Sequence, residues 1–158
     1  MFKISKTASV NLSVLIAVVC IVAFALFGMI LPFVWKDTPY LADFINSIEM
    51  NNSALTKEMF FAWFYGVLIV VEICCVVVLF LLLRVRKGLV FSEITVSLIR
   101  FVSWGCVLLA VLGFVGEMFH NMMFVFALAA AFLGLCLRVV KNVMEEATAL
   151  KKENDFTV

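Results

Sequence analysis

The longest uncharged stretch of the chain lies between Lys6 and Lys36. No Asp, Glu, Lys or Arg interrupts it, and almost every residue from Leu12 to Trp35 is apolar. An α-helix rises about 1.5 Å per residue, so a stretch of this length crosses the roughly 30 Å hydrocarbon core of a bilayer with some tilt. A helix also satisfies its own backbone hydrogen bonds, which lipid cannot do. The stretch therefore predicts a transmembrane helix.

The composition extends this conclusion to the whole chain. Hydrophobic residues make up 66% of the 158 residues and charged residues only 15%. Soluble domains are about half apolar and about one quarter charged. We therefore expect one all-α, polytopic membrane domain over residues 1–158, with the lipid bilayer as its first partner.

Charged residues mark the ends of four predicted transmembrane helices, which we expect to pack as a four-helix bundle. The apolar stretch from Phe101 to Leu137 is too long for one crossing and contains the interruption "GFVGEMFHN", so the chain must turn back there. We place the helices at about residues 12–35, 59–83, 93–117 and 121–147, the last including an extension beyond the membrane.

Basic residues are concentrated on one side of these helices. Ten of the twelve Lys and Arg residues fall there: Lys3, Lys6, Arg84, Arg86, Lys87, Arg100, Arg138, Lys141, Lys151 and Lys152. Only Lys36 and Lys57 fall on the other side. Because Lys and Arg accumulate on the cytoplasmic side of membrane proteins, we expect both termini in the cytoplasm. The net charge of +1 gives no indication of nucleic-acid binding, and we expect none.

The outer loop, residues 36–58, is the one sizeable segment outside the predicted membrane region. The sequence "YLADFINSIEM" predicts a short surface helix with four apolar residues facing the membrane: Leu41, Phe44, Ile45 and Ile48. The helix that follows begins with an aromatic group typical of a membrane-interface belt: Phe60, Phe61, Trp63, Phe64 and Tyr65.

Small residues predict how the last two helices meet. Glycine and alanine recur in the third helix at Gly105, Ala110, Gly113 and Gly116, and in the fourth at Ala127, Ala130, Ala131 and Gly134. Small residues at this spacing let two backbones approach closely. We expect a tight antiparallel hairpin, with a contact between two copies of the chain as the alternative.

Glu72 lies near the predicted bilayer midplane, where an ionised carboxylate is costly. No Lys, Arg or His lies at matching depth in the other helices. We expect a neutral Glu72 that faces the other helices and donates a hydrogen bond to a backbone carbonyl. A contact with a ligand or a partner's helix, and a proton or cation site, are the alternatives.

We predict no catalytic, cofactor or metal site. His120 is the one histidine and lies at a predicted turn, without a second imidazole to complete a ligand set. All five cysteines lie within the predicted helices, and Cys74 and Cys75 are adjacent, not spaced as in a redox CxxC motif. Because Glu72, Glu117 and His120 do not converge, we expect a protein that is not an enzyme.

The connection between the second and third helices carries helix-end signals. Gly88 is expected to end the second helix in a left-handed conformation, and Ser92 is expected to cap the third ahead of Glu93. Beyond Arg138 the fourth helix continues with apolar residues spaced three and four apart, at Val140, Val143, Ala147 and Leu150. This pattern predicts an amphipathic extension into the cytoplasm, which needs a surface to lie against.

Two of these cytoplasmic stretches resemble a known family. "KGLVFSEITVSLIRF" is similar to the segment between the second and third helices in domain-of-unknown-function family 2975, small bacterial four-helix membrane proteins; it supplies Phe91, Ser92 and Arg100. The last six residues resemble that family's "ENDLTV" terminus, with one Phe in place of Leu: Glu153, Asn154, Asp155, Phe156, Thr157 and Val158. The resemblance implies a bacterial inner-membrane protein without enzymatic activity, often encoded beside a small Cro-repressor-like helix-turn-helix protein.

Two functional hypotheses follow. The first is a regulatory or sensor partner of a cytoplasmic transcription regulator, with the C-terminal residues as a docking element. Those residues could equally close over the loop from Arg84 to Ser92. The second hypothesis is a small transporter or a bacteriocin self-immunity membrane protein that uses Glu72.

Overall fold

The computed structural model describes residues 6–51 and 56–156 and confirms an all-helical chain. It contains five helices: α1 (Lys6–Val34), α2 (Pro39–Asn51), α3 (Lys57–Arg86), α4 (Glu93–Gly116) and α5 (Met123–Phe156). Of these, α1, α3, α4 and α5 are long and apolar enough to cross a membrane. Each of the four predicted spans coincides with one of them. By length and composition, the protein is therefore a multi-pass membrane protein.

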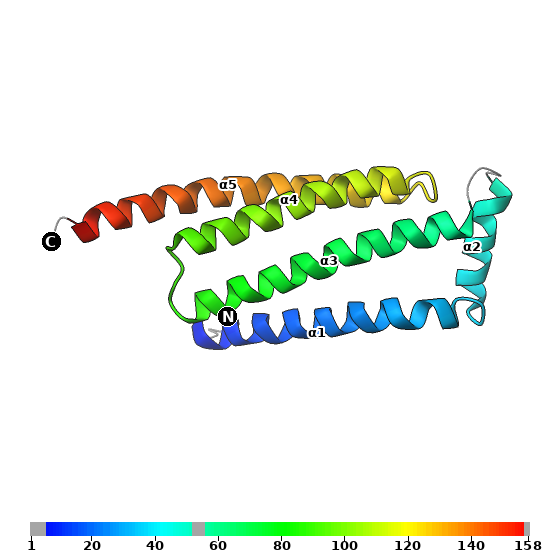
Figure 1. The fold of residues 1–158 in the computed structure, drawn as a ribbon, viewed down its shortest axis with the longest axis horizontal. Coiled ribbons are helices and arrows are strands. Elements are labelled where there is room, and N and C mark those ends of the chain that lie inside the picture. Colours follow the sequence, from blue (N-terminus) through cyan, green and yellow to red (C-terminus); the bar gives the residue numbers. More distant parts are fainter. Residues whose placement is uncertain (1–5, 52–55, 157–158) are drawn as a thin grey trace, which may run out of the picture.

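The four long helices lie along a common axis, and α2 lies across one end of them (Figure 1). The helices pack in the order α1, α3, α4, α5, and α2 packs against α3. In the described part of the chain, α1 does not pack against α5. The four-helix bundle is thus an open row, an order of packing that the sequence did not indicate. We call its two ends the α2 end and the basic end, the latter carrying the connection from α3 to α4.

Three of the long helices extend beyond their predicted limits. The start of α1 is Lys6 instead of residue 12, and α5 continues to Phe156 instead of residue 147. Charged residues end an apolar stretch, but Lys and Glu are good helix formers and do not end a helix. Only α4 ends within one residue of its predicted limits.

Local chemistry at the α3–α4 connection determines where α3 ends and where α4 begins. Gly88 has a positive φ of 75°, and the amide of Leu89 donates to the carbonyl of Arg84 over 3.1 Å, which completes a Schellman motif. The Ser92 hydroxyl accepts from the amide of Thr95 and caps α4. Both predicted helix ends are confirmed.

The α4–α5 interface is the most extensive in the molecule, and it confirms the predicted antiparallel hairpin. A Cβ added at Gly113 would lie 2.9 Å from the Cβ of Ala127, which is itself fully buried. The buried Ser103 hydroxyl donates to the carbonyl of Gly134 over 2.9 Å. Gly105 and Gly116 have a different role than expected, because they face the α3 side chains Cys74 and Trp63, respectively.

The α2 helix faces the protein and not the membrane, which corrects the sequence interpretation. Ile45 and Ile48 are 1% and 3% exposed and form a buried cluster with Phe60 of α3. Five partly buried aromatic side chains surround this cluster: Trp35, Phe44, Phe61, Trp63 and Phe119. Much of the predicted aromatic belt therefore packs inside the protein.

Tyr65 joins α3 to α1 through a hydrogen bond that Pro32 makes available. Proline has no amide hydrogen, so the carbonyl of Gly28, four residues earlier, lacks its usual helical donor. The Tyr65 hydroxyl donates to this carbonyl over 2.9 Å. At the same end, the Trp63 indole nitrogen donates to the carbonyl of Leu112 over 2.8 Å and joins α3 to α4.

Candidate interaction site at the basic end

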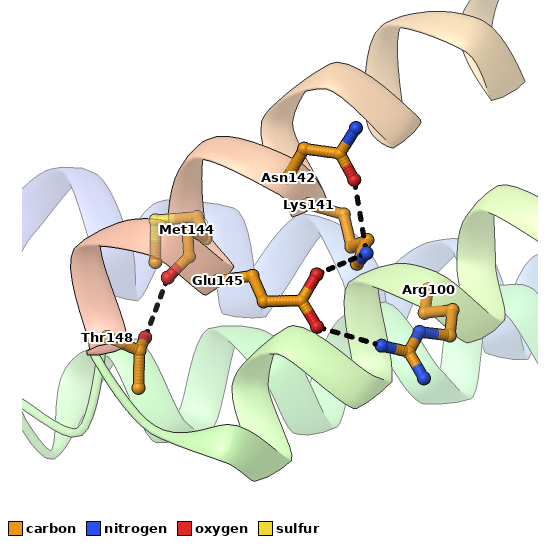
Figure 2. A network of polar contacts seen from close by, with 6 residues as sticks. All are labelled: Arg100, Lys141, Asn142, Met144, Glu145 and Thr148. Atoms are coloured by element: carbon orange, nitrogen blue, oxygen red, sulfur yellow. Dashed lines mark hydrogen bonds and ion pairs between the residues drawn. The ribbon is translucent and has the colours of Figure 1, made fainter. Parts of the chain in front are cut away.

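Ion pairs join α4 to the part of α5 that extends toward the basic end (Figure 2). The Arg100 guanidinium donates to the Glu145 carboxylate over 3.2 Å, and Lys141 pairs with the same carboxylate from one turn earlier on α5. Lys141 also donates to the side-chain oxygen of Asn142 over 3.1 Å. The Arg100 and Glu145 side chains are about half exposed, so solvent and salt screen their attraction.

A second ion pair lies one to two turns nearer the C-terminus. Lys152 on α5 lies 3.2 Å from Glu93, the first residue of α4, and both side chains are well exposed. The α3–α4 connection beside it is held more firmly, because the buried Thr95 hydroxyl donates to the carbonyl of Leu89 over 2.9 Å. The ion pairs that join the α5 extension to α4 are thus screened, while the apolar side chains of Val96 and Ile99 on α4 are buried.

The far end of α5 continues past the start of α4 and past the α3–α4 connection (Figure 1). Among the residues expected to form a docking motif, Glu153 and Asn154 are exposed on the last turns of the helix, and the helix continues through Asp155 to Phe156. Thr157 and Val158 lie outside the described residues. The Lys152–Glu93 contact brings this end of α5 close to Ser92, while Phe91 in the connection is 48% exposed.

Three of the four residues of the predicted amphipathic pattern are exposed, and the fourth, Ala147, is half-buried. Val140, Val143 and Leu150 are between 48% and 62% exposed. The α5 residues that face α4 are less apolar and include Lys141 and Thr148. We call Val140, Val143 and Leu150 the apolar stripe; the described part of the chain leaves it without a covering surface.

Glu72 lies near the middle of α3 and takes no part in the ion pairs of this site. Helical spacing places it on the face that carries Tyr65 and Leu68, the two residues that contact Gly28 of α1. Its Oε2 atom is buried and has no hydrogen-bond partner among the described residues. The expected hydrogen bond to a backbone carbonyl is therefore absent at this oxygen.

His120 lies in the turn between α4 and α5. Its Nδ1 atom accepts from the amide of Met122 over 3.1 Å, and its ring packs on Phe44 at 5.5 Å. Within residues 6–51 and 56–156, no group of three or more His, Cys, Asp or Glu side chains is placed to hold a metal ion.

A family model for proteins of unknown function, DUF2975, matches residues 48–158, which is more than half of the chain. The chain belongs to the DUF2975 family. Neither a curated protein nor a solved structure matches it.

The DUF2975 region begins near the end of α2 and includes all of α3, α4 and α5. It contains Glu72, the ion pairs, the apolar stripe and the complete α3–α4 connection. The first helix and most of α2 precede it. The family resemblance noted in the sequence is therefore confirmed for the part of the chain that carries the candidate site.

Sequence reasoning missed Trp104, a residue of the DUF2975 region. The Arg138 guanidinium lies over the indole ring of Trp104, 4.5 Å from its centre. The distribution of basic residues in the sequence placed Arg138 on the same side of the helices as Arg100. Trp104 follows Arg100 by one helical turn, which places it toward the same side of the membrane as Arg138, but their contact depends on how α4 and α5 align.

Proposed function

We propose that this DUF2975 protein is a bacterial inner-membrane protein, not an enzyme, whose α5 extension binds a soluble cytoplasmic regulator. The exposed apolar stripe on α5 carries the proposal, because such a stripe on a helix that continues beyond its neighbours is an incomplete packing surface. A partner that lays its own apolar residues against Val140, Val143 and Leu150 would complete it.

The weak attachment of the extension supports the same proposal. The Arg100–Glu145 and Lys152–Glu93 pairs are solvent-exposed, so a partner can replace them at small cost. The family resemblance suggests the chemical nature of that partner, a small helix-turn-helix regulator. Its contact with this protein would be protein to protein, and the regulator would supply the contact with DNA.

The proposed orientation rests on the charge distribution. The basic end carries nearly all Lys and Arg residues, so both termini are in the cytoplasm. A cytoplasmic reporter fused after Val158 should be active, and a periplasmic reporter should be active only when inserted near Asn51. The opposite reporter activities would place the apolar stripe outside the cell and contradict the proposal.

Deletion of residues 151–158 tests the docking element. The four long apolar helices lose none of their membrane-spanning residues, so the variant should insert and melt like the wild type in detergent, yet lose a co-purifying cytosolic protein. Retention of that protein together with a lower melting temperature would show instead that these residues only close over the α3–α4 connection.

A matched pair of substitutions separates the apolar stripe from general charge effects. Leu150→Gln removes an exposed apolar group from the stripe, whereas Lys151→Gln changes the adjacent exposed residue. We expect Leu150→Gln to weaken capture of the regulator and Lys151→Gln to leave it nearly unchanged. Equal effects would count against the stripe.

The unpartnered oxygen of Glu72 favours a second candidate function, a small transporter or a self-immunity protein. A buried carboxyl without a hydrogen-bond partner could hold a proton or a cation during transport. Glu72→Gln preserves the size and polarity of the side chain, and Glu72→Leu removes its polarity. Equal loss of function in two well-folded variants would favour this candidate, whereas tolerance of Glu72→Gln would exclude a proton or cation role.

A further inference from the structure

Two hollows meet in the half of α4 that is nearer the basic end. One is an apolar cleft of about 410 Å³ between α3 and α4, and the other is a basic hollow of about 280 Å³ between α4 and α5. Arg100 and Trp104 line both of them. The apolar cleft and the basic hollow therefore adjoin at the side chains of Arg100 and Trp104 and together offer a charged part and an apolar part.

The basic hollow has an excess of positive charge. Its cations are Arg100, Arg138 and Lys141, and the carboxylate of Glu145 pairs with two of them, Arg100 and Lys141. Arg138 has no carboxylate partner in residues 6–51 and 56–156, and its guanidinium is held against the Trp104 ring. Two positive charges thus remain uncompensated at a point where the hollow opens to the surface.

The apolar cleft continues from this charge toward the middle of the membrane-spanning region. On α4 it extends from Ser97 to Leu108, a rise of about 16 Å at 1.5 Å per residue. Its α3 wall consists of Val70, Ile73 and Cys74, and no charged side chain other than Arg100 lines it. These dimensions suit a single hydrocarbon chain lying between two helices.

We propose that this site binds one anionic phospholipid, with its phosphate at Arg138 and one acyl chain in the apolar cleft. The charge decides the class of lipid. A zwitterionic headgroup would bring an ammonium group whose nearest carboxylate, Glu145, already pairs with two cations. An anionic headgroup brings only the negative charge that the hollow lacks. This inference does not depend on the proposed function, since it involves neither the apolar stripe nor a soluble partner.

The test is native mass spectrometry of the full chain in a neutral detergent. Dioleoyl phosphatidylglycerol should bind about fivefold more tightly than dioleoyl phosphatidylcholine, as expected for one additional phosphate–cation contact near a membrane surface. Equal retention of the two lipids would overturn the proposal.

Two variants distinguish lipid binding in the basic hollow from a general attraction of anionic lipid to the basic end. Arg138→Gln should reduce the preference for phosphatidylglycerol to less than about twofold. Arg86→Gln removes an exposed cation at the same end, outside both hollows, and should keep the full preference. An equal loss in the two variants would show unspecific attraction. If Arg138→Gln does not fold, Lys141→Gln tests the same hollow, and an unchanged preference in it would contradict the proposal.

Two further experiments distinguish a bound lipid from a free phosphate and from a second copy of the chain. Millimolar inorganic phosphate should not displace the lipid, and Leu108→Trp, which fills the cleft without changing charge, should weaken lipid binding. Displacement by phosphate would assign the hollow to a free anion. A lipid-free dimer that disappears in Leu108→Trp would assign the cleft to a second copy.

Discussion

The two ends of the helix row are held together by different kinds of interaction. At the α2 end, Ile45, Ile48 and Phe60 are almost completely buried, and aromatic rings from several segments pack around them. At the basic end, the polar contacts between α4 and the α5 extension are ion pairs whose acidic partners, Glu93 and Glu145, are more than half exposed. Buried apolar contacts are worth several times more than exposed ion pairs. The α2 end should therefore be fixed, while the basic end remains available for a partner.

The largest predicted effect is at the α2 end. Phe60→Ala removes the ring at the centre of the buried cluster and should lower the free energy of unfolding by about 3 kcal/mol. Met59→Ala is the matched control, because Met59 is the neighbouring residue and is 49% exposed. Denaturant unfolding of the two variants in the same detergent measures the difference. Similar losses in both would show that the cluster does not fix this end.

A smaller effect is expected where the α4–α5 hairpin passes from close packing to ion pairs. Ser103→Ala removes the hydroxyl that bonds to the carbonyl of Gly134 and should cost about 1 kcal/mol. Ser97→Ala changes an exposed serine two turns earlier on α4 and should be nearly neutral. The same unfolding experiment gives both values. An effect at Ser103 as large as that at Phe60 would remove the distinction between the two ends.

The smallest effect is expected at the basic end itself. Glu145→Gln removes the negative charge that attracts Arg100 and Lys141, yet its melting temperature should be indistinguishable from that of the adjacent control, Glu146→Gln. Any difference should disappear at high salt, because salt screens exposed charges. A large, salt-insensitive loss in Glu145→Gln would mean that this end is fixed as well.

Features that depend on local chemistry or on close backbone contact were predictable from the sequence. Gly88 and Ser92 end and begin helices through their own backbone conformation and side chain, so their roles were visible without the fold. The small residues Gly113 and Ala127 likewise predicted the hairpin, because only small residues permit such an approach.

Features that depend on what an apolar side chain contacts were not predictable. The spacing of Ile45 and Ile48 marks an apolar face, but it does not tell whether lipid or protein covers that face. The open order of the helices also escaped prediction, since α1 is apolar on all sides and could pack in several ways. In the candidate site, the pairing of Arg138 with Trp104 required knowledge of how α4 and α5 align.

Hydrogen exchange on the full chain in detergent tests most directly whether the two ends differ as described. Backbone amides in residues 39–48, held by the buried cluster, should exchange about one hundredfold more slowly than those in residues 145–156 of the α5 extension. Addition of the regulator should slow exchange in the extension alone. Equal protection of the two segments without a partner would contradict the account, because the basic end would then be as fixed as the α2 end.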